Sequence, residues 1–181
     1  MDRPAERNRR PQTTARHSLE PLLRDAFSSF AEDLTTSGWR GKENDCVNRF
    51  AHGHLLARCP GGIFRHPTQM GIEVGVPQPP GVGEKGAAKK DLVIWPEPWM
   101  STWTPDWRPA NIPTVVMEWK LCHARKRLIG CAHDRRWVEG FARWQPGTLG
   151  LTVIVDLDAR RHRLHIGRYL REEADPDWLM L

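Results

Sequence analysis

Charged side chains interrupt two otherwise apolar segments of the chain. Asp91 opens the run 91–95 (DLVIW), and Glu118 and Lys120 close the run 114–120 (TVVMEWK). Because side chains alternate between the two faces of a strand, Glu118 and Lys120 would leave the same face. Two carboxylates brought together favour a cation between them, and oxygen ligands suit Mg²⁺ or Mn²⁺. Lys120 beside such a metal could orient or deprotonate a water molecule, so these residues predict metal-dependent hydrolysis.

The same Glu-x-Lys spacing has an ordinary structural interpretation. An ion pair at an exposed strand end contributes only tenths of a kcal/mol to stability and needs no function. Short matches of this kind are common, so the surrounding elements must decide between the two interpretations.

Hydrophobic periodicity predicts helices before and between these strands. Apolar residues at helical spacing indicate helices over 19–34, where Ser18 is a plausible cap, and over 42–57, where Glu43 shares a stripe with Val47 and Phe50. A third helix is expected at 133–144. Alternating or β-branched apolar runs predict strands at 71–76, 91–95, 114–120, 149–157 and 163–169.

The order of these elements predicts the fold class. The first three strands are expected to form an antiparallel meander, and the helix at 133–144 would cross over to the buried strand at 149–157. The chain is therefore predicted to be an α/β (α+β) domain, with a mixed β-sheet flanked by helices.

In this context the segments 90–94 (KDLVI) and 115–120 (VVMEWK) resemble the second-strand and third-strand motifs of the PD-(D/E)XK nuclease superfamily. The resemblance covers about 42–157 and implies a restriction-endonuclease-like core. Lys90 stands where the superfamily often has the proline of its name. A tryptophan- and proline-rich insertion at 95–113 separates Asp91 from Glu118.

The resemblance implies a role for each matching residue. Asp91, Glu118 and the backbone carbonyl of Trp119 would bind Mg²⁺ or Mn²⁺. Lys120 would activate the attacking water, and Glu43 would support the metal or the water. The implied activity is Mg²⁺-dependent nuclease cleavage of phosphodiester bonds, with DNA as the expected substrate.

Basic residues follow the third strand and begin the next helix. Arg125 and Lys126, then Arg135 and Arg136, would place positive charge beside the metal site and contact phosphate, although a solvated basic face has the same composition. The formal net charge of +5 agrees with a polyanionic partner without establishing one.

Length and composition predict the domain organisation. The 181 residues suit one domain over 18–181, preceded by a disordered basic arm at 1–17 that is rich in arginine and poor in apolar residues. The sequence has no apolar run of transmembrane length and no secretory signal, so we expect a soluble, cytoplasmic protein without a membrane partner.

The insertion carries tryptophans at every fourth position, Trp95, Trp99, Trp103 and Trp107, but its prolines disfavour a continuous helix. The rings either bury as a satellite cluster under a loop or form a surface for unpaired bases or for a second copy of the chain in a homodimer.

Two other functions remain open from the sequence. The fold could serve as a noncatalytic nucleic-acid-binding or interaction module. Alternatively, Cys122, His123, Cys131 and His133 could make a small zinc-binding regulator, although their spacings differ from those of usual structural zinc sites.

Overall fold

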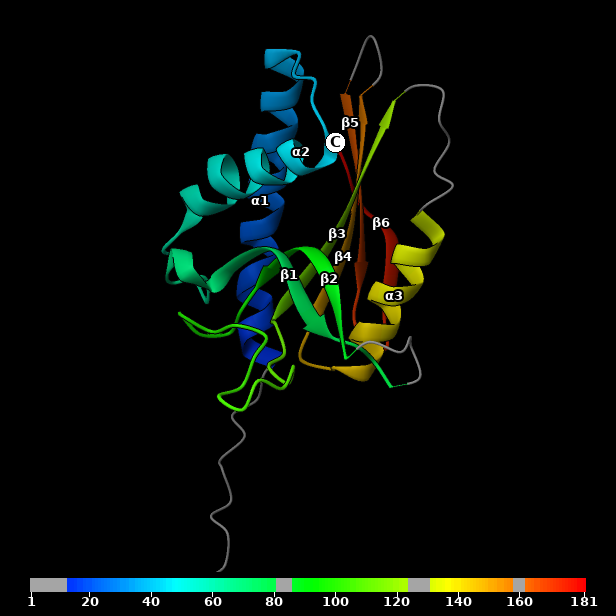
Figure 1. The fold of residues 1–181 in the computed structure, drawn as a ribbon. Helices are drawn as coiled ribbons and strands as arrows, with labels where there is room; N and C mark the ends of the chain where they lie inside the picture. Colours follow the sequence, from blue (N-terminus) through cyan, green and yellow to red (C-terminus); the bar gives the residue numbers. More distant parts are fainter. Residues whose placement is uncertain (1–12, 81–85, 124–130, 158–161) are drawn as a thin grey trace, which may run out of the picture.

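The computed structural model describes residues 13–80, 86–123, 131–157 and 162–181. A six-stranded sheet forms the centre, and its strands lie side by side in chain order (Figure 1). The strands are β1 (Met70–Pro77), β2 (Ala87–Ile94), β3 (Val115–His123), β4 (Leu149–Leu157), β5 (His162–Tyr169) and β6 (Ala174–Met180). The principal helices are α1 (Thr13–Ser37), α2 (Glu43–Arg49) and α3 (Cys131–Trp144).

The sheet is mixed, as its sequence pattern predicts. β1, β2 and β3 pair antiparallel in succession, which confirms the meander. β3 and β4 pair in parallel, and α3 makes the crossover between them. β4, β5 and β6 then continue antiparallel. The α+β class is therefore confirmed.

One face of the sheet packs against α1, α2 and the short helices after α2. Phe27 and Phe50 stack at 4.6 Å between ring centroids, and both lie close to the buried ring of Trp119 from β3. Aromatic side chains bury large areas and prefer such offset or tilted contacts. This cluster fixes α2, and with it the start of that helix, against the end of β3.

The opposite face packs against α3. Val93 and Val116 of the sheet are buried there with Trp137 and Phe141 of α3, whose rings stack at 4.9 Å. Since Val116 belongs to this face, strand alternation directs Glu118 and Lys120 of β3 to the same side. Glu118 and Lys120 thus lie on the side of the sheet that α3 covers.

Two helices and one strand differ notably from the sequence prediction. α1 begins at Thr13, inside the segment that was expected to be a disordered arm; residues 1–12 lie outside the described residues. The helix expected at 42–57 changes pitch, because α2 is followed by π-helical turns at Phe50–Leu55 and a 3₁₀ turn at Leu56–Arg58. β6 was not predicted, because Asp175, Pro176 and Asp177 give its start a loop composition.

The insertion forms an ordered loop in which the tryptophans differ in exposure. Trp95 is buried, whereas Trp99 and Trp107 are each 79% exposed and Trp103 is 44% exposed. The amide of Asn111 donates to the carbonyl groups of Ser101 and Trp103 at 2.7 and 3.2 Å, which ties the loop together. The segment is neither a helix nor a purely buried satellite cluster. Among the described residues, no helix is long and apolar enough to cross a membrane.

Candidate active site

The site begins where β3 extends beyond its pairing with β2. The pairing comprises three residue pairs and ends at Leu92 with Met117. Past that point, Asp91 Oδ2 accepts a hydrogen bond from the backbone N–H of Trp119 at 2.6 Å, and Glu43 Oε2 accepts one from the N–H of Leu121 at 3.0 Å. Carboxylates from β2 and α2 thus satisfy backbone donors that a neighbouring strand would otherwise satisfy.

Lys120 is held by acidic groups from two helices. Its Nζ lies 3.3 Å from Glu43 Oε1 and 3.3 Å from Asp134 Oδ2 of α3, and it donates to the carbonyl of Trp119 at 2.8 Å. Burial disfavours the ammonium form, but attraction to Glu43, Asp134 and Asp91 outweighs burial and raises the pKa of Lys120. The side chain is therefore a fixed cation in this state of the protein.

Glu118 forms a buried ion pair with Lys90. The two side chains are 8% and 7% exposed, and Glu118 Oε1 contacts Lys90 Nζ. The pKa of the Glu118 carboxyl group is raised to about 7, mainly by burial and also by the neighbouring Asp91, against the lowering effect of Lys90. Asp91 and Glu118 are thus close enough to interact, as the sequence predicted.

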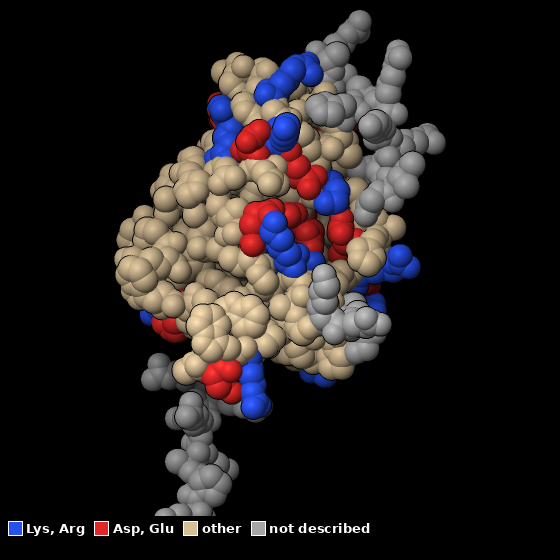
Figure 2. Space-filling model, in the orientation of Figure 1, with Lys and Arg blue, Asp and Glu red and all other residues tan. Residues whose placement is uncertain are grey.

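The charges of this group leave a negative surplus. Among the described residues, four carboxyl groups stand against the two ammonium groups of Lys90 and Lys120, which gives a formal charge of −2 when all are ionised; the carboxyl groups are those of Glu43, Asp91, Glu118 and Asp134. Figure 2 shows acidic side chains gathered, with basic ones beside them, near the middle of the face, where Figure 1 places β2 and β3. A divalent cation would balance this surplus.

The carboxylate and carbonyl oxygens of the site fit a hard metal in type and charge, but two of these groups already contact lysine ammonium groups. Glu118 Oε1 contacts Lys90, and the carbonyl of Trp119 accepts from Lys120. In the described part of the chain, no group of three or more His, Cys, Asp or Glu is arranged to hold a metal ion. Metal binding would have to draw on Asp91, Glu118 and the Trp119 carbonyl together.

The structure brings together Glu43, Asp91, Glu118 and Lys120, which the sequence singled out from three separate segments. Two further members, Lys90 and Asp134, were not among the predicted site residues. Lys90 could have been found from its position directly before Asp91, at the start of an apolar strand. No sequence pattern around Asp134 pointed to a role in the site.

The predicted phosphate-contacting residues are placed in part. Arg135 and Arg136 are exposed at the start of α3, and the guanidinium carbon of Arg135 lies 5.8 Å from the ring centroid of Tyr169. Arg125 and Lys126 fall in 124–130, outside the described residues. Cys122 and Cys131 are free thiols, and burial is the main cause of the raised pKa of each.

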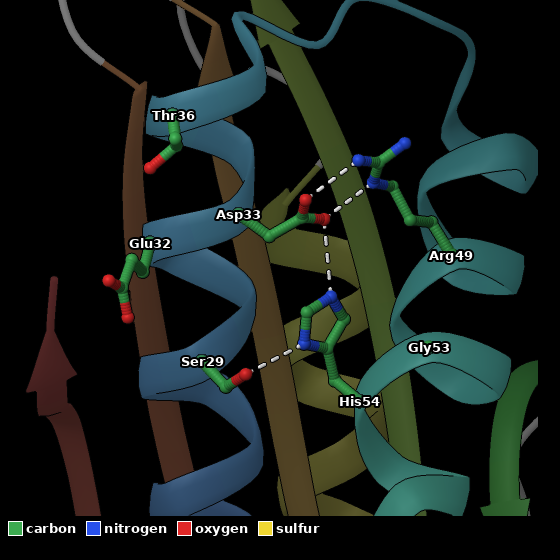
Figure 3. Close-up of a pocket in the computed structure, with 7 residues that line it drawn as sticks. All are labelled: Ser29, Glu32, Asp33, Thr36, Arg49, Gly53 and His54. Atoms are coloured by element: carbon green, nitrogen blue, oxygen red, sulfur yellow. Dashed lines mark hydrogen bonds and ion pairs between the residues drawn. The ribbon is translucent and has the colours of Figure 1, made fainter.

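A second group of titratable side chains lies between α1 and the π-helical turns. It borders an open hollow of about 490 Å³ whose lining residues are Ser29, Glu32, Asp33, Thr36, Arg49, Gly53 and His54 (Figure 3). Asp33 accepts from Arg49 Nε at 2.6 Å and from Arg49 Nη2 at 2.7 Å. This bidentate pair is the geometry that guanidinium and carboxylate groups prefer.

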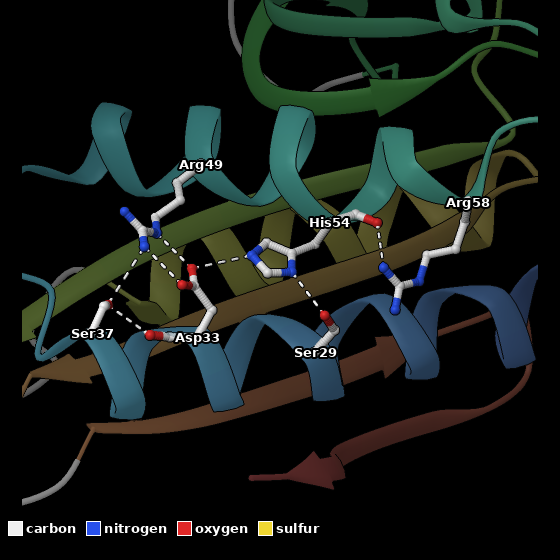
Figure 4. A network of polar contacts seen from close by, with 6 residues as sticks. All are labelled: Ser29, Asp33, Ser37, Arg49, His54 and Arg58. Atoms are coloured by element: carbon white, nitrogen blue, oxygen red, sulfur yellow. Dashed lines mark hydrogen bonds and ion pairs between the residues drawn. The ribbon is translucent and has the colours of Figure 1, made fainter.

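His54 completes this network with a serine, as Figure 4 shows. Its Nε2 lies 3.2 Å from Asp33 Oδ2, and its Nδ1 lies 3.0 Å from Ser29 Oγ. The residue types match those of a Ser-His-Asp triad. However, Ser29 lies inside the long helix α1, where backbone N–H groups bond within the helix and cannot form an oxyanion hole. The network is therefore a structural tie between two helices.

Comparison with known proteins adds no family assignment. A scan of protein-family models found no match, and searches of curated proteins and of solved structures found none either.

Proposed function

We propose that the chain is a Mg²⁺-dependent nuclease that hydrolyses phosphodiester bonds, with DNA as the substrate. The observation that carries the proposal is the convergence of Glu43, Asp91, Glu118 and Lys120 at the open end of β3. The motifs resemble those of the PD-(D/E)XK superfamily. That superfamily also combines an acid from a helix, an acid from the second strand and Glu-x-Lys on the third strand.

Each residue would contribute to the reaction through its position. Asp91, Glu118 and the Trp119 carbonyl would hold the metal, which supplies Lewis-acid stabilisation of the scissile phosphate when bound. Lys120 is placed by Glu43 and would orient the attacking water and neutralise charge that develops on the phosphate.

The partner in this proposal is nucleic acid. Arg135 and Arg136 are exposed on α3, the same helix that supplies Asp134 to the site. Cationic side chains there would position the phosphate backbone without reading its sequence. We place the activity in the cytoplasm, and the exposed tryptophans of the insertion offer a surface for unpaired bases or for a homodimer.

The test is cleavage of plasmid and oligonucleotide DNA with Mg²⁺ or Mn²⁺. We expect Lys120→Ala to cut about 10²–10³ times more slowly than wild type, because one electrostatic group of the transition state is lost. Its fold should persist, since the Lys120 side chain is 32% exposed and its removal leaves no core cavity. Glu118→Gln should also weaken metal binding. A Lys120→Ala variant as fast as wild type, or cleavage that survives EDTA, would overturn the proposal.

One observation favours a second candidate, a noncatalytic nucleic-acid-binding module on the same fold. Lys90 and Lys120 already contact Glu118 and the Trp119 carbonyl, so the cluster is held together without a metal. Under this alternative, DNA binding would be unchanged by Mg²⁺, by EDTA and by Lys120→Ala.

A further inference from the structure

Lys90 is the most enclosed lysine of the candidate site. Its side chain is 7% exposed, its Nζ contacts Glu118 Oε1, and the same nitrogen lies 3.6 Å from the ring centroid of Trp137 on α3. An ammonium group out of water is costly unless it is paired, and both contacts compensate that cost. The residue is therefore fixed between a carboxylate and an aromatic face.

The backbone of β2 is irregular at this point, which brings two neighbouring residues to one carboxylate. Ala88 packs with the cluster under α3, as Lys90 does, whereas Leu92 packs on the opposite face. Strand alternation would have put all three on one face. The pairing of β1 with β2 runs from Val74 with Lys90 to Ile72 with Leu92, and between them Glu73 has a positive φ of 57°.

The preceding residue of the strand is a lysine in an ordinary surface environment. Lys89 is 67% exposed and pairs with Glu73 at the surface. Exposed pairs of this kind contribute little to stability and do not fix the position of a neighbouring group. Lys89 and Lys90 thus differ in burial and partner while sharing side-chain type and strand.

We propose that Lys90 is a positioning residue for the metal ligand Glu118: its ammonium group holds one carboxylate oxygen so that the group faces the cation site beside Asp91. This role rests on the proposed function and adds a member to the site. Lys90 stands at the motif position where the superfamily often has proline. The residue that departs from the motif would thus have a role in the site. Lys90 itself need not touch metal or substrate.

The physical reason is charge compensation for a buried ligand. Glu118 is 8% exposed and has Asp91 as a like-charged neighbour, so without Lys90 two acids would meet in a poorly solvated place. Partners that orient a ligand in this way typically change metal affinity about 10–100-fold when removed. Trp137 would keep Lys90 from turning toward water.

The experiment measures Mn²⁺ binding by titration calorimetry in wild type, Lys90→Met, Lys90→Arg and Lys89→Met. Methionine keeps the apolar stem beneath Trp137 but has no charge. We expect Lys90→Met to bind Mn²⁺ at least about tenfold more weakly. Lys90→Arg, which restores the charge, should recover part of that loss, and the matched control Lys89→Met should stay within about twofold of wild type.

A second measurement uses no metal and covers the case in which Lys90→Met folds poorly. Unfolding by denaturant is compared for Lys90→Met, Glu118→Gln and the double variant. If the pair is coupled, Lys90→Met should destabilise the protein more when Glu118 is present than when it is glutamine. Additive effects would overturn the positioning role.

The two proposals fail differently. A wild-type protein that binds no Mn²⁺ overturns the proposed function and, with it, this role of Lys90. Wild-type binding that Lys90→Met leaves unchanged or tightens overturns the role of Lys90 alone, and tighter binding would show that the lysine competes with the cation.

Discussion

The cluster at the open end of β3 and the network between α1 and the π-helical turns both gather titratable side chains, but they balance charge differently. In the network, Asp33 has Arg49 as a bidentate partner and His54 as a second contact. In the cluster, four carboxyl groups share two ammonium groups. The first arrangement is satisfied by the chain itself, while the second favours an additional cation.

This comparison shows that residue types alone do not identify a catalytic site. The network contains the serine, histidine and aspartate of a hydrolase triad, yet its serine lies within a helix. The cluster lies where two strands separate and backbone donors are satisfied by acids. What distinguishes the two is unbalanced charge at a place where backbone pairing ends.

The largest effect is expected from Asp91→Asn in the cluster. The substitution removes the charge of a proposed metal ligand but keeps an oxygen that can accept from the N–H of Trp119. We expect cleavage to fall by about 10²–10³. Stability should change by no more than about 1 kcal/mol. Cleavage assays and denaturant titrations measure the two effects, and a loss of stability that matches the loss of activity would assign Asp91 a structural role only.

The next largest effect is expected in how stability and cleavage depend on pH, through the titration of Glu118. Its pKa is raised to about 7 from an ordinary value of 4.5, so between these pH values the folded protein holds a proton that the unfolded chain releases. This contribution to stability is complete below about pH 4.5 and is lost as the pH rises through 7. The proposed metal-dependent cleavage would need the carboxylate, so we expect it to rise with pH over the same range, by about tenfold per unit below 7.

Denaturant titrations and cleavage rates from pH 5 to 8 test both trends, with Glu118→Gln as the matched control for stability. If wild type and the control show the same dependence of unfolding on pH, Glu118 does not titrate in this range.

Asp33→Ala should have a smaller effect, and it should change stability and not cleavage. The variant loses the bidentate contact with Arg49 and the contact with His54, so the free energy of unfolding should fall by about 1–3 kcal/mol. The hydrogen bond from Arg49 lowers the pKa of Asp33, against the effect of burial, so this stabilisation is present above about pH 3.8 and lost as the pH falls below it. Cleavage by the folded protein should match wild type, and a specific loss of activity would make the network part of the site.

The smallest effect is expected from Ser29→Ala. The substitution removes one hydrogen bond to His54 and favours the helix, so stability should change by less than about 1 kcal/mol. Esterase and nuclease activities should be those of wild type. A loss of any hydrolytic activity would revive the triad interpretation.

Much of the scaffold could be predicted from the sequence because its core strands are rich in β-branched and apolar residues. The segment 149–157 was predicted with the bounds that β4 has. The strand expected at 91–95 begins earlier, at Ala87, because Lys89 and Lys90 masked its start. β6 was missed because a polar edge strand with a proline has no apolar period.

The candidate site was predictable only where it follows strand and helix periodicity. Glu43 could be placed because it shares a helical stripe with Val47, and Glu118 with Lys120 because they are two apart in a strand. Asp134 and the burial of Lys90 follow from the packing of α3 on the sheet. No local pattern contains that information, because it depends on residues distant in the sequence.

The exposed tryptophans of the insertion have a consequence for how this surface can change. Trp99 and Trp107 have positive φ values of 64° and 59°, where a large residue costs roughly 1–2 kcal/mol relative to glycine. Hydrogen bonds among polar groups of the loop, such as those from Asn111, hold the backbone, while the two rings make surface contacts with His66 and Trp103. Evolution can therefore exchange the rings, and with them what the surface recognises, without remodelling the core.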